Sequence, residues 1–272
     1  SEFGSLEAMP ETTKLLIDGG AYFENFFVAT PICCPSRTEF ITGRYYHNIG
    51  APSGSCMHIN AEDNVFNVTG SMFGLLESAG YNTGVFGKVT NDQAGYFCGK
   101  ERDAGMTTIS SPCDFNDFYS KKYFMKYPNG SKHIETLEMK PETYQTSQLG
   151  NRSIAWIKEI ANGGKPFFAY IGPHAPHFPA TPAPWIQNDP FKNLTFPRTP
   201  NWNVESPDKH QLIRQNPPFD DRVASWETQH MKDRWSTLVT VDEVVAAVID
   251  TLKKLDVLDD TYIFYSSDHG YK

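Results

Sequence analysis

The sequence predicts an α/β protein whose sheet is mainly parallel. Short apolar runs typical of buried strands alternate with segments of helical periodicity, which is the pattern of a sheet flanked by helices. Polar residues follow each run, as expected where the carboxyl ends of parallel strands share one edge. At 272 residues, the chain is long enough for one large domain or two small ones with a substantial core.

The first helical signals lie in the amino-terminal third. Residues 15–20 combine a short apolar run with two glycines and predict a helix end followed by a turn. Ser36 is expected to cap a helix start, with Glu39 in the capping-box position. Residues 72–79 predict a short amphipathic helix that ends at Gly80.

Two longer helices are expected further along the chain. Residues 142–162 predict one that ends at a pair of glycines. Between Pro173 and Pro218 lie 11 of the 19 prolines, which predicts an irregular surface segment suited to the rim of a site. The clearest helix follows, with apolar residues at spacings of three and four: Leu238, Val241, Val245, Val248, Leu252 and Leu255.

Three strands are expected: Thr83–Phe86, Pro166–Ile171 and Tyr262–Tyr265. In a parallel sheet, ligand groups gather at the carboxyl ends of the strands. We therefore expect one site formed by the segments that follow these strands, which are Gly87–Lys88, Pro173–His177 and Asp268–His269.

The composition favours a globular, acidic protein. Lys and Arg total 24 and Asp and Glu total 32, so the formal net charge is 24 − 32 = −8. That balance argues against binding nucleic acid through phosphate neutralisation. Hydrophobic residues make up 39% and charged residues 21%, which is typical of a folded domain. No apolar run approaches the roughly 18 residues of a membrane span.

Cysteines and glycosylation signals point to the secretory pathway. No pair or cluster of cysteines has the spacing of a zinc site. If one of the five cysteines has a chemical role, four remain for disulfides whose pairing stays open: the five are Cys33, Cys34, Cys56, Cys98 and Cys113. Sequons that favour a glycoprotein begin at Asn67, Asn129, Asn151 and Asn193.

The most informative segment runs from Cys33 to Arg44. A cysteine at a helix amino terminus meets free N–H groups and a positive dipole end, which activate the thiol and attract anions. Arg37 adds a cation one turn away. A tyrosine-phosphatase loop would need Arg six residues after its Cys, whereas those positions hold Glu39 and Phe40. The remaining alternative from these residues alone is a buried cysteine pair beside a helix cap.

This segment resembles the signature of the sulfatase family. The match is Cys33-x-Pro35-Ser36-Arg37 followed by Thr42-Gly43-Arg44, and the similarity extends from about Met9 to the end of the chain. The segments 175–179 and 238–270 are most similar to the N-acetylglucosamine-6-sulfatase and heparan 6-O-endosulfatase branch. The resemblance implies an alkaline-phosphatase-like fold.

The resemblance also implies the catalytic roles. In sulfatases the signature Cys, here Cys33, is oxidised to formylglycine (3-oxoalanine) by the formylglycine-generating enzyme and becomes the nucleophile. Arg37 would hold its hydroxyls, and Lys88 would contact the sulfate. His177 would bind sulfate or protonate the leaving group.

Substrate-binding and metal residues follow from the same resemblance. Asn91 matches an Asn of the branch, and His174 is a weaker candidate at the rim. The metal, Ca²⁺ or Mg²⁺, would be held by Asp268, His269 and Cys33, with the carboxylate as the natural oxygen ligand.

The chain departs from the family pattern at both ends. Sulfatases begin with a strand that ends in an Asp-Asp pair, and nothing before Cys33 matches it. A second sulfate-contacting lysine is also not matched after Gly270. We therefore expect residues 1–8 to be a cloning remnant and residues 9–272 to be the central part of a sulfatase catalytic domain, without its C-terminal subdomain.

The expected function is hydrolysis of sulfate monoesters of a sulfated sugar or glycosaminoglycan, in a lysosomal or secreted protein. One alternative is a catalytically inactive fragment or a protein that binds sulfated glycans. Another is a phosphate-ester hydrolase of the alkaline phosphatase superfamily, which the intact Cys33–Arg37 signature disfavours.

Overall fold

The computed structural model describes residues 4–49, 70–91, 94–99, 106–114, 118–186 and 190–270. Its centre is a five-stranded sheet in the order β4-β3-β2-β1-β5. β1 pairs in parallel with β2 and β5, whereas β3 pairs antiparallel with β2 and β4. The α/β prediction is thus confirmed, with a mixed sheet. The strands are β1 Asn82–Gly87, β2 Thr108–Pro112, β3 Lys122–Lys126, β4 Lys132–Thr136 and β5 Phe167–Gly172.

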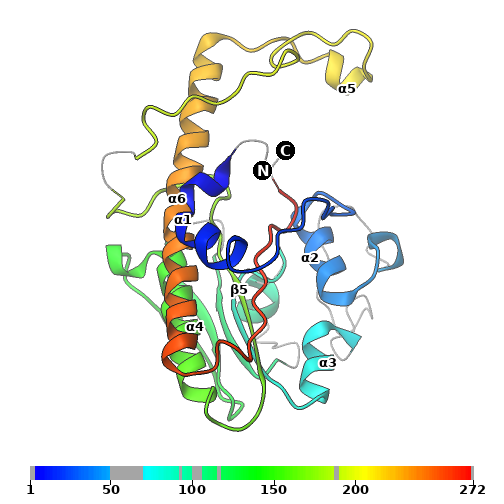
Figure 1. Cartoon of the computed structure of the whole chain (residues 1–272). Coiled ribbons are helices and arrows are strands. Elements are labelled where there is room, and N and C mark those ends of the chain that lie inside the picture. Colours follow the sequence, from blue (N-terminus) through cyan, green and yellow to red (C-terminus); the bar gives the residue numbers. More distant parts are fainter. Residues whose placement is uncertain are drawn as a thin grey trace.

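Helices cover both faces of the sheet. α4 packs on β1 and β5, and α6 packs on α4, whereas α3 contacts β1 and α2 on the other side (Figure 1). The α-helices are α1 Pro10–Thr12, α2 Cys33–Thr42, α3 Met72–Ser78, α4 Gln145–Ile160, α5 Gln211–Arg214 and α6 Asp221–Lys254. Short 3-10 or π turns occupy η1 Ser5–Ala8, η2 Thr13–Ile17, η3 Tyr46–Asn48, η5 Ala94–Gly99 and η6 Pro141–Thr143. None of the helices in the described part of the chain is long and apolar enough to cross a membrane.

The core divides into two layers because side chains alternate along β1. Val85 points to the layer under α2 and α3, where it packs with Phe73. Phe86 points to the opposite layer, where it packs against Trp156 of α4 and Leu252 of α6. β1 is therefore buried on both faces, which is the environment that continuous apolar runs predict, whereas most of β5 is partly buried.

The longest helix, α6, begins 17 residues before the predicted start at Leu238. Asp220 caps it, with a side-chain oxygen accepting a hydrogen bond from the Val223 N–H at 2.9 Å. At 34 residues the helix is about 50 Å long. Its amino-terminal half rises beyond the sheet towards α5, whereas its carboxyl-terminal half packs on α4 (Figure 1).

Two local predictions are wrong. Helix α2 begins at Cys33 rather than after Ser36, because Pro35 is tolerated in a first turn and Ser36 uses its hydroxyl elsewhere. Tyr262–Tyr265 is not a strand in the structure. No described strand pairs with this segment, and a strand exists only where a neighbour completes its hydrogen bonds. Tyr262 is accordingly 92% exposed and Phe264 85%.

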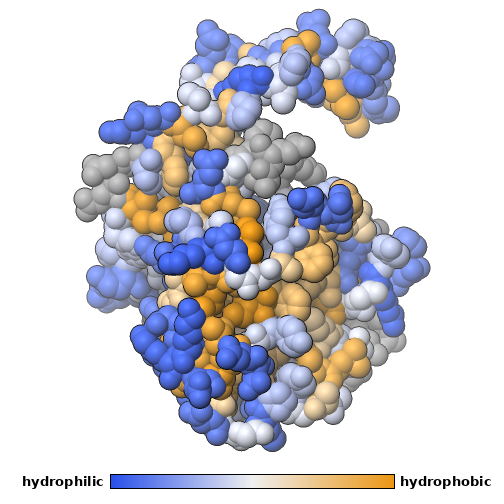
Figure 2. Space-filling view, in the orientation of Figure 1, coloured by the Kyte–Doolittle hydropathy of each residue, from blue (hydrophilic) through white to orange (hydrophobic). Residues whose placement is uncertain are grey.

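Hydrophobic residues reach the surface in the middle of one face, between the α6 side and the α2 side of the molecule (Figure 2). The exposed large hydrophobic residues include Tyr262, Phe264 and, from the stretch before α2, Phe23, Phe26 and Phe27.

Candidate active site

The candidate site lies at the edge of the sheet that the sequence predicted. β1 and β5 are in register to their last residues, with Gly87 beside Gly172, and Lys88 N–H donates to the Gly172 carbonyl at 2.8 Å. Gly87 has a φ of 102°, and a Cβ there would lie 2.2 Å from the Gly172 oxygen. Only glycine fits this close approach, which brings the segments after both strands together.

Cys33 is the first residue of α2, with Ile32 as the N-cap. Its Sγ lies 3.2 Å from Nε2 of His269. A hydrogen bond with His177 lowers the pKa of the Cys33 thiol to about 6, against the opposing effect of burial and with help from the Lys88 charge. Neighbouring Cys34 points the other way and is fully buried in the core. The site thus favours an anion at residue 33.

Arg37 ties three segments together one turn further along α2. Its Nε donates to Oδ2 of Asp268 at 2.9 Å. One terminal nitrogen donates to the Lys88 carbonyl and to the Tyr170 hydroxyl, each at 2.8 Å. Burial alone would raise the pKa of the Asp268 carboxyl, but the Arg37 charge and its hydrogen bond hold it below the ordinary value.

Lys88 adds a second cation to this edge. Its side chain is 5% exposed, and burial together with the Arg37 charge lowers its pKa. Two cations held this close together raise the local positive potential, because neither is fully solvated. The side chains around Cys33 therefore favour an anionic group.

His177 and His174 come from the loop after β5, with their ring centroids 4.8 Å apart. Both direct a ring nitrogen at the Phe178 carbonyl: Nδ1 of His177 at 2.7 Å and Nε2 of His174 at 3.2 Å. The hydrogen bond with Cys33 raises the pKa of His177 in spite of burial. Burial, with the His177 charge, lowers the pKa of His174 to about 3. The pKa values of the two rings are thus shifted in opposite directions from the ordinary value of a histidine.

His174 is not at the rim, where the sequence placed it. It is 4% exposed and packs edge-on against Phe118, with centroids 5.0 Å apart. Its Nδ1 is buried without a hydrogen-bond partner. Asn91 likewise has a buried Oδ1 without a partner, which leaves an acceptor three residues after Lys88.

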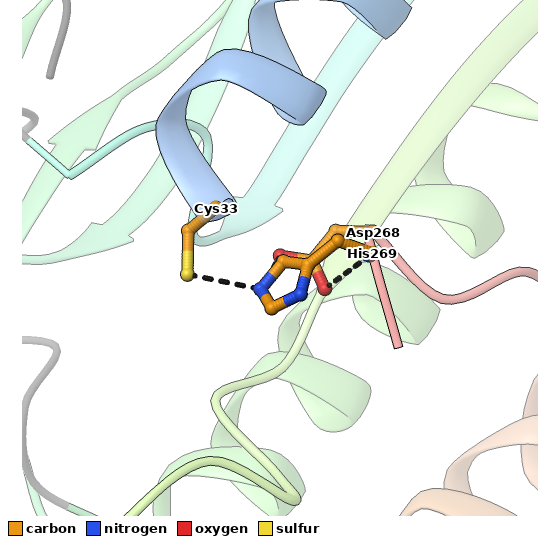
Figure 3. A group of neighbouring side chains, drawn as sticks. All are labelled: Cys33, Asp268 and His269. Carbon is orange, nitrogen blue, oxygen red and sulfur yellow. Dashed lines mark hydrogen bonds and ion pairs between the residues drawn. The ribbon is translucent and has the colours of Figure 1, made fainter. Parts of the chain in front are cut away.

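The three predicted metal ligands are brought together at the start of α2 (Figure 3). Donor atoms of Cys33, Asp268 and His269 all lie within 4.8 Å of one another. Calcium requires about six to eight oxygen ligands. This set offers one carboxylate, whose Oδ2 already accepts from Arg37 and whose Oδ1 accepts from the His269 N–H. Among the described residues, this set alone would supply too few oxygen ligands to complete a calcium shell.

Sequence reasoning missed several residues that support the site. The Tyr170 hydroxyl accepts from Arg37, although the apolar run around it indicated only a buried strand. Ser36 donates its hydroxyl hydrogen bond to the Asp268 carbonyl. Nε of Arg234, on α6, donates to the Pro176 carbonyl at 3.1 Å and holds the histidine loop. No sequence signal links these residues, because their partners lie far away along the chain.

The cysteine pairing is also decided only in three dimensions. Cys98 and Cys113 form a disulfide, and Cys33 and Cys34 are free. Cys56 lies outside the described residues. Of the four sequon asparagines, Asn67 also lies outside them, and the other three are exposed.

Comparisons with known proteins agree with this geometry. A model of the sulfatase family matches residues 2–272. The extracellular sulfatase SULF-1 homolog of Drosophila melanogaster is 33% identical over 279 residues, which cover 99% of this chain and 24% of the fly protein. The N-acetylglucosamine-6-sulfatase of Bos taurus is 31% identical over 285 residues, which cover 98% of this chain and 48% of the bovine protein.

A solved structure has the same fold. It is that of a protein in complex with its substrate D-glucosamine-2-N,6-O-disulfate, with a TM-score of 0.64 and 19% identity, covering 93% of this chain and 58% of that one. The alkaline-phosphatase-like fold is therefore confirmed. The chain spans between a quarter and a half of the length of these two curated relatives. Because the family model matches nearly every residue, this chain belongs to the sulfatase family.

Proposed function

We propose that this chain carries the active site of a sulfuric ester hydrolase that cleaves sulfate monoesters of a sugar. The observation that carries the proposal is the convergence of Cys33, Arg37, Lys88 and His177 from three separate segments, which are helix α2 and the stretches after β1 and β5. A sulfate monoester is a singly charged anion, and this pocket offers two cations and an imidazole beside one activated side chain. The relatives named above support the proposal, because their names describe sulfatases.

The nucleophile would be formylglycine made from Cys33 by the formylglycine-generating enzyme. Its hydrated aldehyde supplies a hydroxyl that attacks the sulfur of the ester. Cys33 suits this role because it stands at a helix amino terminus, is partly accessible and touches two histidines. Cys34 does not suit it, because it is fully buried.

The chain's own residues would bind the sulfate and supply a proton. Arg37 is fixed by three hydrogen bonds, so its remaining N–H groups are held in one orientation towards the pocket. Lys88 would neutralise the sulfate oxygens. His177 donates Nδ1–H to the Phe178 carbonyl, which leaves Nε2 towards residue 33, where it would protonate the departing sugar oxygen.

The substrate class is inferred from the relatives. One is an N-acetylglucosamine-6-sulfatase, and the solved neighbour was bound to a 6-O-sulfated glucosamine. We infer a 6-O-sulfated amino sugar as the substrate. An extracellular or lysosomal location, reached through the secretory pathway, is supported by the extracellular relative, the Cys98–Cys113 disulfide and the exposed sequons.

The test combines mass spectrometry with hydrolysis. In protein from a eukaryotic host, the peptide containing residue 33 should be about 18 Da lighter than the cysteine form, the mass difference of the free aldehyde. The chain should then hydrolyse 4-nitrophenyl sulfate faster than 4-nitrophenyl phosphate, and Cys33→Ala should abolish the activity. An unmodified thiol with no turnover would contradict the proposal, and preference for the phosphate would favour the phosphatase alternative. Binding of a sulfated sugar without turnover would favour the glycan-binding alternative.

A further inference from the structure

A row of aromatic rings leads away from the proposed active site. Phe178 directly follows His177 in the loop after β5, and its side chain is 58% exposed. Trp226 and His230 lie on α6 four residues apart, so they are neighbours on one side of the helix. Trp226 is 56% exposed, whereas His230 between the two is buried.

The three rings are in contact in single file. Phe178 and His230 have ring centroids 5.7 Å apart at an interplanar angle of 56°. His230 and Trp226 are stacked, with centroids 5.1 Å apart and an angle of 8°. Arg234, one turn beyond His230, anchors the helix to the loop by donating to the Pro176 carbonyl. The row is therefore attached to the loop that carries His177, at a fixed place.

This row is not explained by the core. Neither Phe178 nor Trp226 belongs to the three clusters of buried side chains in the described part of the chain. Large aromatic side chains bury about 150–250 Å² when covered, so leaving two of them in water forgoes a large hydrophobic gain. Exposed aromatic rings next to a reactive pocket are a common feature of ligand sites.

We propose that the exposed rings of Phe178 and Trp226, held apart by the buried ring of His230, form a carbohydrate subsite that binds pyranose rings adjoining the sulfated sugar of an oligosaccharide. This inference rests on the proposed function. The sugar oxygen that takes the proton from His177 must lie against His177, so the rest of the sugar chain passes Phe178, the next residue. The C–H face of a pyranose is apolar, and it packs on the negative face of an aromatic ring.

A sugar chain fits this row better than a protein partner would. The row exposes two large aromatic side chains, beginning with the residue after His177, whereas a stable protein interface needs about 800 Å² on each partner. Arg222 lies one turn before Trp226 on α6, with a side chain that is 89% exposed and ion-paired with Asp220 at 3.6 Å.

The kinetic test compares substrates of different length in Trp226→Ala. The probes are a 6-O-sulfated glucosamine tetrasaccharide, glucosamine 6-sulfate and 4-nitrophenyl sulfate. We expect KM for the tetrasaccharide to rise about tenfold, the size of one lost stacking contact, with kcat unchanged. KM for the two short substrates should change less than about twofold, because these substrates do not reach the subsite and lose no binding there. Trp226→Phe should restore most of the affinity.

Tyr127→Ala is the matched control. Tyr127 is also an exposed ring stacked on a histidine, His133, with centroids 5.7 Å apart. It follows β3 at the opposite edge of the sheet, since Lys126 pairs with Ile109 near the start of β2. Tyr127→Ala should leave every substrate unaffected, and neither variant should lower the melting temperature appreciably.

A binding measurement separates the two proposals. Calorimetry should detect binding of the tetrasaccharide to the Cys33→Ala variant. In the double variant that also carries Trp226→Ala, this binding should be about tenfold weaker. If 4-nitrophenyl sulfate is hydrolysed but Trp226→Ala changes neither KM nor binding of the tetrasaccharide, the subsite is wrong and the proposed function stands. If no sulfate ester is hydrolysed but Trp226→Ala weakens binding, the proposed function fails and the row remains a glycan-binding site.

Discussion

At the scale of single residues, the two histidines of the loop after β5 have pKa values that shift in opposite directions. His177 is exposed, and its hydrogen bond with Cys33 raises its pKa, which favours its charged form. His174 is enclosed by Phe118 and lies close to the cations His177, Lys88 and Arg37, which favour its neutral form. The pKa values of two histidines in one loop thus differ because burial and neighbouring charge differ.

This difference predicts how stability depends on pH. His174 takes up a proton near pH 6.5 when unfolded but only near pH 3 when folded. Between these values the unfolded state binds the extra proton, so the free energy of unfolding should fall by about 1.4 kcal/mol for each pH unit of acidification. Urea denaturation of the wild type and His174→Gln between pH 6.5 and 4.5 measures this contribution, which the variant should lack.

His133→Gln is the control, because His133 is an exposed histidine on β4. It should keep the slope of the wild type. Equal slopes for the wild type and His174→Gln would show that His174 is not held neutral.

The sequence predicted which residues form the site better than it predicted how those residues pack. Cys33, Arg37, Lys88, His177 and Asp268 were each singled out from the sequence and lie at one edge of the sheet. The burial of His174 and the contact between Arg37 and Tyr170 were not predicted. The burial and the contact both depend on which element packs against a residue, and the local spacing of residues in the sequence does not report this packing.

At the scale of elements, α1 is docked on α6 through one buried carboxylate. Asp242 is 5% exposed and accepts three hydrogen bonds from the start of α1. They come from the N–H of Thr12 at 2.6 Å, its hydroxyl at 2.7 Å and the N–H of Glu11 at 3.0 Å. A three-residue helix has little stability of its own, so this anchor holds the amino-terminal segment in place.

Asp242→Ala should therefore be strongly destabilising. It leaves three donors without an acceptor inside the protein, and we expect the free energy of unfolding to fall by about 2–4 kcal/mol. Asp242→Asn keeps one acceptor, so its free energy of unfolding should fall by less. Asp250→Ala, which breaks only the surface ion pair with Lys254, is the control and should cost under about 0.5 kcal/mol. Urea titrations that give Asp242→Ala and Asp250→Ala the same free energy of unfolding would contradict the role of Asp242 as an anchor.

The predictions of helices and strands were correct where an apolar segment packs against another element that buries it. β1, β5 and α4 lie close to their predicted bounds because each packs into a layer of the core. β2 was missed, since its sequence Thr-Ile-Ser-Ser-Pro is rich in hydroxyls, although every residue of the strand is buried. Its polar groups are accommodated by partners such as the Gly87 carbonyl, which accepts from Ser111. Tyr262–Tyr265 has the pattern of a strand and no described strand to pair with.

At the scale of the whole molecule, the site joins the two ends of the described chain. Arg37 and Asp268 are separated by 231 positions and connected by one ion pair. Cys33 and His269 are separated by 236 positions and lie in contact. Closing so long a loop costs chain entropy, which the packed core has to offset. The geometry of the pocket is thus a property of the complete fold and of no single motif.

The donor set of this assembled site predicts weak calcium binding by this chain. Among the residues that the structure describes, this group offers one carboxylate, already paired with Arg37, and so provides few of the oxygen ligands that calcium needs. We expect a dissociation constant above about 1 mM, weaker than the usual extracellular calcium modules. Isothermal titration calorimetry with calcium chloride measures it, with Asp268→Asn as the comparison. Tight binding at one ion per chain would contradict the expectation.

Residue types and their order were sufficient to predict an α/β fold, a sulfatase-like signature and an anion-binding edge. They were sufficient because apolar periodicity reports burial, and because a signature such as Cys33 to Arg37 places an acidic thiol and a cation one helical turn apart. The tertiary structure alone decided the Cys98–Cys113 pairing, the burial of His174 and the aromatic row from Phe178 to Trp226. Each of these depends on contacts between segments far apart in the chain, which only the packing of helices on the sheet brings together.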